Sequence, residues 1–426
     1  MDAFDILRDK PQQADLDKCV HCGLCLNSCP TYRELGIEMD SPRGRIYQMN
    51  LVAAGAPITA GYREHLDLCL ACRGCESACP SGVQYGRLIE DARAQIEATR
   101  PRSLPVRWLR RFVFGTLLPS RTLLRLAALQ LAIYQRSGLQ SLVRTLGLLR
   151  PLGLEKLDEL SPSAEFPTFF SQYGKVFPAH GERRYKVALL GGCIANVSFA
   201  RLNEATVRVL QANGCEVHVP SGQTCCGALA LHAGVRGTAR RLAAQNVQAL
   251  SGAGFDALIT NAAGCGSTLK EYDHLLGTAE ARRFSSLVKD INEFLASIEL
   301  APPPTPVPLR VTYQDSCHLC HGQKIRSAPR KLLNAIPGLT FVEMPGSELC
   351  CGSAGIYNIV QNEMSMKLLD KKMAAIATTQ AAAIATANPG CMIQLTAGAR
   401  LNNTGQTVHH VVELLDRAYS TVRNSE

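Results

Sequence analysis

Several common sequence features are missing from this chain of 426 residues. No stretch approaches the about 18 consecutive apolar residues that a membrane-spanning helix requires, so we expect no such helix. No Gly-x-Gly-x-x-Gly segment follows an expected strand and no nucleophile–base signature is present, which argues against a dinucleotide site and against nucleophilic catalysis. The first residues, Met1 to Arg8, carry acidic side chains and lack an apolar centre, which predicts no secretory signal.

Acidic residues are absent between Arg102 and Arg150, a segment whose nine arginines account for the whole formal net charge of +9. These arginines are set among leucines and aromatic residues rather than among glycine, serine and lysine, so we expect no nucleic-acid partner. Two interpretations remain open. The segment is an amphipathic surface that docks on a membrane, or it is a helical linker that packs on the next domain with its arginines solvated.

Cysteine, in contrast, is abundant, because the chain has 18 and most of them lie in tight, repeated spacings. Two runs, Cys19–Pro30 and Cys69–Pro80, both read Cys-x2-Cys-x2-Cys-x3-Cys-Pro, the spacing that holds [4Fe–4S] clusters in bacterial ferredoxins. In a chain of this length, such spacing favours metal binding over disulfides and indicates a reducing, cytoplasmic setting. Zinc is the weaker interpretation of these runs, because tetrahedral zinc sites use two spaced pairs of ligands.

The fourth cysteine of each run is expected to bind the partner cluster, as in two-cluster ferredoxins. We therefore predict two crossed ligand sets for two [4Fe–4S] clusters. One set is Cys19, Cys22, Cys25 and Cys79, and the other is Cys69, Cys72, Cys75 and Cys29. His21 lies between two ligands of the first set, where we expect it to tune the cluster rather than to act as an acid or base.

The residues around these runs predict a helical ferredoxin-like domain over residues 1–100. Helical periodicity recurs, as over 46–54 and 87–99, whereas strand alternation is nearly absent. Residues 101–185 are expected to form the Arg/Leu-rich helical segment, interrupted by prolines, and a connector that is irregular over 161–181.

The remainder of the chain is an internal duplication, which predicts one domain at 186–305 and a second at 306–426. Each copy reads strand–Cys–helix, strand–Cys-Cys-Gly–helix and strand–Gly-Cys–helix. The first copy places Cys193, Cys225, Cys226 and Cys265 in this pattern, and the second places Cys317, Cys350, Cys351 and Cys391. The predicted fold class is therefore α+β overall, with a helical two-cluster ferredoxin-like domain followed by two duplicated α/β domains with parallel sheets.

The matched cysteines follow the carboxyl ends of the expected strands, where parallel α/β sheets hold their ligands. The helices that begin there supply backbone N–H groups and a positive dipole, which suit thiolates. We expect each set of four to hold a metal centre, iron–sulfur in preference to zinc. Burial as small apolar residues does not explain why the positions coincide in both copies.

Two cysteines lie outside the repeated pattern. Cys215 aligns with a leucine of the second copy, so we expect it to be a core residue. Cys320 lies close to a set of the second copy and has His318 and His321 beside it. It is either an extra ligand, which we favour, or a reactive thiol.

The ends of the two copies also match, since Val288–Leu295 aligns with Val408–Leu415. The alignment pairs His409 and His410 with a lysine and an aspartate. We therefore expect no role that the two copies share at these histidines.

Taken together, these motifs resemble the iron–sulfur subunits of bacterial glycolate oxidase (glycolate dehydrogenase), whose cysteine-rich repeats are called CCG domains. The resemblance covers nearly the whole chain. Besides the ferredoxin runs, it is carried by Ser41–Tyr47, Cys79–Val83, Gly264–Gly266, Lys270–Tyr272 and Leu349–Gly355. It implies an iron–sulfur electron-transfer subunit of an oxidoreductase complex, in which the chain alone does not act on substrate.

Separate flavin-containing subunits oxidise glycolate to glyoxylate in that family. The resemblance therefore implies flavin-containing glycolate dehydrogenase subunits as partners, and an acceptor beyond the iron–sulfur subunit that we expect to be a membrane quinone. Together with the segment over residues 102–150, it implies a cytoplasmic protein that is peripheral on the inner face of the membrane.

The chain departs from the broader CCG pattern, which ends in Cys-x-x-Cys, because Thr268 and Gln394 replace the last cysteine of the two copies. The five-ligand form supports non-cubane clusters, whereas four thiolates suffice for a cubane. Other hypotheses are a heterodisulfide-reductase-like or quinone-reducing enzyme subunit that acts at a CCG cluster, and the iron–sulfur subunit of a lactate or glycerol-3-phosphate dehydrogenase. A zinc-holding scaffold is a further alternative for the CCG half.

Overall fold

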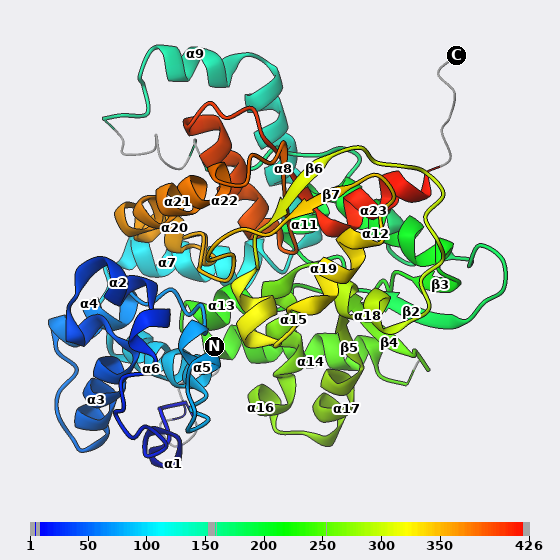
Figure 1. Cartoon of the computed structure of the whole chain (residues 1–426). Helices are drawn as coiled ribbons and strands as arrows, with labels where there is room; N and C mark the ends of the chain where they lie inside the picture. Colours follow the sequence, from blue (N-terminus) through cyan, green and yellow to red (C-terminus); the bar gives the residue numbers. More distant parts are fainter. Residues whose placement is uncertain (1–4, 6–8, 152–157, 159, 253, 421–426) are drawn as a thin grey trace.

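The structure, a computed structural model, describes residues 5, 9–151, 158, 160–252 and 254–420 (Figure 1). The predicted fold class is confirmed, since a helical N-terminal part precedes two α/β repeats with parallel sheets. In Figure 1 the blue helices of the N-terminal part lie together at one side of the molecule, and α9 projects from the top.

Between residues 9 and 100, the described elements are all helical. They are α1 (Gln13–Leu16), η1 (Leu26–Ser28), α2 (Pro30–Leu35), η2 (Glu38–Asp40), α3 (Pro42–Ala53), α4 (Ala60–Asp67), α5 (Gly74–Ser77) and α6 (Tyr85–Thr99). Local sequence explains where α3 begins, because Pro42 takes its first position and the Ser41 hydroxyl accepts a hydrogen bond from the Gly44 amide at 3.0 Å. α3, α4 and α6 surround the ferredoxin-type loops with a small apolar core.

The Arg/Leu-rich segment forms α7 (Leu104–Phe112), the π-helix η3 (Val113–Leu117), α8 (Arg121–Arg136) and α9 (Leu139–Thr145). One side of this segment packs on the first α/β domain through Phe114, Leu118, Leu124, Ala128 and Ala132. The other side leaves large apolar side chains exposed, among them Leu104, Trp108, Leu126 and Ile133. The segment therefore packs as a linker would, and it also presents an apolar surface with arginines and no acidic residue.

Across the described residues, no single helix has the length and apolar character needed to cross a membrane. The helices Leu104–Leu117 and Arg121–Arg136 reach that length and composition only as a pair, and the chain bends by 108° between them.

The first α/β domain is built on a five-stranded sheet in the order β1-β3-β2-β4-β5. Its strands are β1 (Val176–Phe177), β2 (Tyr185–Leu189), β3 (Cys215–His218), β4 (Ala257–Thr260) and β5 (Val288–Asp290). All neighbours pair in parallel except β1, which adds to the edge beside β3 in the antiparallel sense. The prediction of an irregular connector over 161–181 was therefore partly wrong, because this connector supplies β1 and the short helix η4 (Phe169–Gln172).

The helices of this domain connect its parallel strands, except for the last, which follows β5. They are α11 (Ile194–Ser198), α12 (Ala200–Ala212), α13 (Ala228–His232), α14 (Arg236–Leu250), α15 (Ala263–Lys270), α16 (Tyr272–Leu276), α17 (Ala279–Leu287) and α18 (Ile291–Ser297). The chain leaves β2 toward β3 on one side and reaches β4 on the other, so the strand order reverses beside β2. Ligands of open α/β sheets bind at such a point.

The second α/β domain repeats this plan with a fully parallel sheet in the order β7-β6-β8-β9. Its strands are β6 (Arg310–Tyr313), β7 (Thr340–Val342), β8 (Ala383–Thr386) and β9 (Thr407–His410). Its helices are η5 (His318–Gly322), which is a π-helix, α19 (Ser327–Asn334), α20 (Tyr357–Val360), α21 (Asn362–Ala377), α22 (Pro389–Leu401) and α23 (Val411–Tyr419). The order of the four parallel strands is the same in both domains, which agrees with the duplication seen in the sequence.

The two repeats pack against each other through equivalent helices. α12 of the first domain packs on α23 of the second, and α18 of the first packs on α19 of the second. Their apolar side chains form one continuous core that includes Leu202, Leu295, Leu333 and Leu414. This reciprocal arrangement places the two repeats around an approximate two-fold axis.

Asp290 and His410 do share a role, which corrects our expectation for these positions. Asp290 caps α18 and His410 caps α23, each accepting a hydrogen bond from the backbone two residues later, at 2.8 and 3.1 Å. Glu293 and Glu413 complete a capping box at the two sites. The sequence alignment hid the shared role because an aspartate and a histidine can both accept this hydrogen bond.

Candidate iron–sulfur centres

The two ferredoxin-type loops adopt the same unusual backbone. The second residue after the first cysteine has a positive φ in both, 54° at His21 and 52° at Ala71, and so does the fourth, 84° at Gly23 and 63° at Arg73. Residues other than glycine rarely adopt a positive φ, so its recurrence at matched positions shows that both loops have the same backbone conformation. At Arg73 the conformation is held by half-buried partners, since the guanidinium reaches Glu76 at 3.0 Å and Glu271 at 2.7 Å.

The structure brings together the crossed sets that the spacing predicts. Cys29 lines one small cavity with Cys69, Cys72 and Cys75. Cys79, in turn, lies close enough to Cys19 for its charge, after the larger effect of burial, to raise the pKa of that thiol. The convergence agrees with the crossed pattern, while the ligand roles themselves stay predictions.

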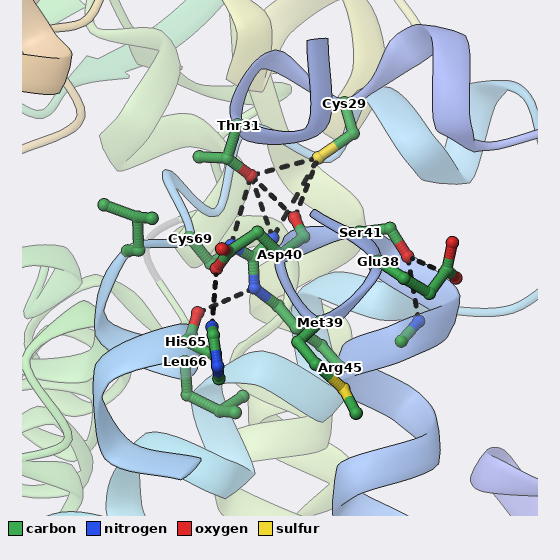
Figure 2. Close-up of polar contacts among 12 residues, drawn as sticks. Cys29, Thr31, Glu38, Met39, Asp40, Ser41, Arg45, His65, Leu66 and Cys69 are labelled. Carbon is green, nitrogen blue, oxygen red and sulfur yellow. Dashed lines mark hydrogen bonds and ion pairs between the residues drawn. The ribbon is translucent and has the colours of Figure 1, made fainter. Parts of the chain in front are cut away.

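Hydrogen-bond donors lie beside two sulfurs of the set that contains Cys29, and Figure 2 shows the surroundings of Cys29 itself. The Ala71 amide and the Tyr85 hydroxyl donate to the Cys69 Sγ at 3.4 and 3.7 Å. The guanidinium of Arg45 lies 3.9 Å from the Cys29 Sγ. Donors of this kind suit sulfur atoms that carry negative charge, as thiolates bound to iron do.

Arg45 is held in place by a buried polar network, which Figure 2 shows. Its Nε donates to the His65 carbonyl at 2.7 Å, and its terminal nitrogens reach the Thr31 hydroxyl at 3.1 Å and the Asp40 carboxylate at 3.3 Å. Burial opposes the charge of this guanidinium, but the nearby negative groups, Cys69 first, outweigh it and raise the pKa of Arg45. A permanent positive charge therefore lies beside this set.

The other ferredoxin-type set lies at the surface. Of the cysteines, all of which fall in the described part of the chain, Cys22 alone is exposed. Its apolar neighbours Val20 and Leu24 are 67% and 61% exposed. This set is therefore the one that an external redox partner can approach most closely.

The first CCG domain gathers its four cysteines beyond the ends of β2, β3 and β4. The Sγ atoms of Cys193 and Cys225 are 3.4 Å apart, and those of Cys226 and Cys265 are 3.0 Å apart. Gly227 follows at a φ of 83° and donates its amide to the Cys225 Sγ at 3.5 Å. A left-handed backbone at this position explains why glycine follows the paired cysteines.

The second CCG domain repeats the arrangement. Thiol contacts run from Cys317 to Cys350, from there to Cys351, and on to Cys391. Gly352 has a φ of 91°, and its amide donates to the Cys350 Sγ at 3.4 Å. A side chain there would also lie 2.4 Å from the Ser365 carbonyl oxygen, so glycine is required for packing as well as for conformation.

Cys25 and Cys351 illustrate how burial makes a thiol of these sets a poor acid in the folded chain. Burial raises the pKa of Cys25 to about 11, and the contact with Cys350 together with burial raises the pKa of Cys351 to about 12. A buried thiolate is therefore stabilised only if a cation replaces its proton, which is what iron or zinc binding does. Four converging sulfurs and sulfur-directed N–H groups in each set fit such a centre.

The sulfurs are not, however, spread around the position of one metal ion. Among the described residues, no group of three or more Cys, His, Asp or Glu side chains has an arrangement suited to a single ion. The assignment of each centre therefore rests on the spacing and the convergence of the cysteines.

The two remaining cysteines lie apart from these sets. Cys215 is completely buried in β3, as expected of a core residue. Cys320 lies in η5, where its thiol is 3.8 Å from the Cys317 carbonyl oxygen and outside the row of thiol contacts. Burial raises its pKa to about 12, so this thiol has neither the position of a fifth ligand nor the acidity of a reactive nucleophile.

Three polar residues beside the sulfurs were not predicted from the sequence, namely Arg45, Tyr85 and Asn388. Arg45 was visible only as the end of the turn signal Ser41–Arg45. Asn388 precedes the Pro-Gly-Cys segment of the second CCG domain, and its amide donates to the Cys391 Sγ at 3.5 Å. A single asparagine in that position cannot be recognised from the sequence as a residue of the site.

Family models match most of the chain. A 4Fe–4S dicluster domain matches residues 15–83, the linker region of the glycolate oxidase iron–sulfur subunit matches 105–162, and the cysteine-rich CCG domain matches 187–270 and 311–396. The N-terminal part is thus a two-[4Fe–4S] domain, and the cysteine-rich repeats mark the chain as an iron–sulfur protein.

Two similar proteins match nearly the whole chain, and a third matches about half of it. The probable glycolate oxidase iron–sulfur subunit of Bacillus subtilis (strain 168) is 41% identical over 421 residues, which cover 96% of this chain and 95% of that protein. The glycolate oxidase iron–sulfur subunit of Escherichia coli (strain K12) is 33% identical over 411 residues, or 95% of this chain and 94% of that protein. A subunit of the CoM/CoB fumarate reductase of Methanothermobacter marburgensis is 38% identical over 236 residues, 55% of this chain and 47% of that protein. The chain therefore belongs to the family of glycolate oxidase iron–sulfur subunits.

Proposed function

We propose that this chain is the iron–sulfur electron-transfer subunit of a glycolate (2-hydroxy acid) dehydrogenase complex. A partner flavin subunit takes a hydride from glycolate, which becomes glyoxylate, and holds the two electrons. This chain accepts them one at a time and passes them to an acceptor, which we propose is a membrane quinone. The chain alone does not act on glycolate.

The observation that carries this proposal is the arrangement of the cysteines by depth. The set that includes Cys22 lies at the surface, whereas the second CCG set is buried and the set with Cys29 and the first CCG set are buried except for the half-buried Cys72 and Cys265. An exposed centre can accept electrons from a docked protein, and buried centres can hold them away from solvent. The names of the relatives from Bacillus subtilis and Escherichia coli support glycolate as the substrate of the complex.

The acceptor side of the proposal rests on the Arg/Leu-rich segment. Its exposed apolar side chains, such as Trp108 and Leu109, lie beside Arg107 and Arg111, both of which are exposed. An apolar surface of this kind, with positive charge and without acidic residues, suits the headgroup region of an anionic membrane. We propose that the chain docks there, peripherally on the cytoplasmic face, where a lipid-soluble quinone is within reach.

The test begins with the complex isolated anaerobically through a tag on this chain, because co-purification identifies the flavin subunits. Glycolate is then added to the chain alone, to the flavin subunits alone and to the mixture, and the visible iron–sulfur absorbance is followed. We expect glycolate to bleach the absorbance only in the mixture. Lactate and glycerol 3-phosphate, added in the same way, are the matched substrates that establish specificity. Bleaching of the isolated chain by glycolate, or none in the mixture, would contradict the proposal.

A second hypothesis is an enzyme subunit that reduces a disulfide at a CCG cluster. Its support is the similarity over about half of the chain to the CoM/CoB fumarate reductase subunit. The position of Cys320 argues against it, because this buried thiol does not join the row of sulfurs that ends at Cys391. Oxidation of the reduced chain by a heterodisulfide, followed by absorbance, would favour this second hypothesis.

A further inference from the structure

We propose that the two CCG sites act in series and are not equivalent. The C-terminal site receives electrons from the ferredoxin-like domain, and the N-terminal site lies one step farther along the route, beneath the Arg/Leu-rich segment. This inference rests on the proposed function, and it adds the order of the sites and the residue that joins them.

The first step is indicated by the packing of Cys72. Its side chain packs against a buried cluster that contains Cys317 and Cys350 of the C-terminal site. The two domains are joined at this point by a hydrogen bond from the Tyr357 hydroxyl to the Leu68 carbonyl at 2.8 Å. The ferredoxin-like set with Cys29 therefore adjoins the C-terminal site directly.

The N-terminal site belongs to a different core. Cys193, Cys225 and Cys226 pack in the cluster that also holds Phe114 and Leu118 of the Arg/Leu-rich segment. Arg121 of that segment donates to the Gln223 carbonyl oxygen at 2.9 Å, two residues before the paired cysteines. This site is thus covered on one side by the segment that we propose to meet the membrane. The ferredoxin-like domain also reaches it, because Arg73 donates to the Ser267 hydroxyl at 3.1 Å, two residues after Cys265. Among the described residues, however, no ferredoxin-type cysteine packs in this cluster, whereas Cys72 packs beside the C-terminal site.

Asn388 joins the two CCG sites. Its amide nitrogen donates to the Cys391 Sγ at 3.5 Å, and its amide oxygen accepts from the Gly264 amide, next to Cys265, at 3.3 Å. The adjacent backbone supports this bridge, because the Ala263 amide donates to the Ala387 carbonyl at 3.3 Å. A single side chain therefore spans from a sulfur of one site to the backbone beside a sulfur of the other.

The bridge is built from one side only. Ala262 occupies the corresponding position before the Ala-Gly-Cys segment of the first domain, and its methyl group cannot return the hydrogen bond. The approximate two-fold symmetry of the repeats is broken here, so the two sulfur sets are electronically different. Cys391 therefore has a side-chain donor to its sulfur that the matched position of the first domain does not supply to Cys265.

Each step transfers one electron and breaks or forms no bond. The electron comes from the flavin of the partner, enters the exposed set with Cys22, and passes through the set with Cys29 to the C-terminal and then to the N-terminal CCG site. Each site is oxidised as the next is reduced, and the quinone takes the electrons at the end. Zinc cannot change its oxidation state, so the series requires iron at both CCG sites.

The order is tested by electron paramagnetic resonance on the full-length chain, reduced anaerobically with dithionite. Cys351→Ser removes the C-terminal centre and Cys226→Ser is the matched change in the N-terminal domain. We expect magnetic broadening of the ferredoxin-type signals to be relieved in Cys351→Ser and retained in Cys226→Ser. Intact ferredoxin-type signals in both variants establish that the chains fold. Broadening that is relieved in Cys226→Ser instead would overturn the order.

The role of Asn388 is tested separately in the complex with its flavin partner, by freezing samples at intervals after glycolate is added. Asn388→Ala should keep both CCG centres but slow reduction of the N-terminal one several-fold, so that the reduced C-terminal centre accumulates. Asn402→Ala, at the exposed end of α22, is the control and should match the unaltered chain. Unchanged kinetics in Asn388→Ala would overturn the bridging role.

Failure of the proposed function gives a different result. In that case the flavin partner reduces no centre in any variant, whereas the dithionite experiment still reports the order of the sites.

Discussion

The guanidinium of Arg45 lies 3.9 Å from the Sγ of Cys29, and only 1% of the Arg45 residue is exposed. Asp40 is the one carboxylate that the ion pairs of the described residues place on this guanidinium, at 3.3 Å. A reduced cluster carries one more negative charge than an oxidised one. The positive charge beside Cys29 therefore favours reduction of the cluster that this cysteine is predicted to bind.

Replacing Arg45 with methionine should lower the reduction potential of that cluster, because it removes the positive charge and keeps an apolar side chain of similar length. Coulomb's law, at an effective dielectric constant of about 20 and separations of roughly 5–10 Å, gives about 2–3 kcal/mol, or on the order of 100 mV for one electron. The measurement is a redox titration followed by electron paramagnetic resonance.

Arg33→Met provides the matched control, since Arg33 is an exposed arginine at the end of the nearby helix α2. Its loss should move the potential by much less, because solvent screens its charge. A shift of the same size in both variants would mean that net charge, and not the buried position of Arg45, sets the potential.

The cysteine sets could be predicted from sequence because their signal is local. The spacing within Cys19–Pro30 and Cys69–Pro80 specifies a tight loop, and the duplication shows which later cysteines recur at the same structural position. The succession of strands and helices along each repeat followed as well, since each Cys-bearing loop had to leave a strand of a parallel sheet. Those inferences needed no knowledge of how the domains meet.

The contacts between domains could not be predicted in this way. The approach of Cys72 to Cys350, and the bridge from Asn388 to Gly264, depend on the packing of elements that are far apart in the chain. The pairing of β1 at a sheet edge depends on tertiary position too, because a two-residue strand has almost no periodicity to detect. Sequence patterns report local structure, whereas these features are set by docking.

The cap at Asp290 should make stability depend on pH. Burial raises the pKa of this carboxyl to about 6 from 3.8. The folded state therefore binds a proton more tightly than the unfolded state, so stability is highest below about pH 4 and falls as the pH rises to about 6. The loss is at most about 3 kcal/mol, from about 1.4 kcal/mol for each pKa unit.

Asp290→Asn should remove this slope, because asparagine still caps the helix and does not ionise in this range. The readout is the anaerobic thermal midpoint measured across the pH range from about 4 to about 6.

His410, in the same position of the second domain, provides an internal comparison in which stability changes with pH in the opposite direction. Burial lowers its pKa to about 4 from 6.5, so its contribution is present above about pH 6.5 and is lost as the pH falls. An Asp290→Asn chain that keeps the slope of the unaltered protein would contradict this assignment.

The Arg/Leu-rich segment should bind anionic vesicles in a salt-sensitive manner. Arg110 is unsuitable for a test, because it pairs with Glu97 at 3.1 Å, but Arg107 and Arg111 are exposed. Replacing these two with glutamine should weaken binding by about 2 kcal/mol, or roughly thirty-fold, at about 1 kcal/mol for each basic residue. Raising the ionic strength from about 0.1 to about 1 M should have a similar effect, since the Debye length falls from about 10 to about 3 Å.

Sedimentation with anionic and with neutral vesicles provides the measurement. Arg282 and Arg283, two exposed arginines of α17, give the control when they too are replaced by glutamine. Equal weakening by the control pair would assign the effect to net charge. Vesicle binding that does not depend on salt, or the absence of binding, would contradict the membrane proposal. The exposed apolar surface would then be a contact for a protein partner.

The metal content of the chain should exceed that of the two ferredoxin-type clusters, which together hold about eight iron atoms. Cys351→Ser should remove metal from the C-terminal CCG site alone, because Cys351 occupies the centre of the row of sulfurs there. Cys320→Ser is the matched control in the same domain. Its thiol is also buried but lies outside that row, so this variant should keep the metal content of the unaltered chain.

The measurement is anaerobic analysis of iron, sulfide and zinc in the parent chain and the two variants. A parent chain with about eight iron atoms and no zinc would show that neither CCG site binds metal, and loss of metal in Cys320→Ser would make Cys320 a ligand after all.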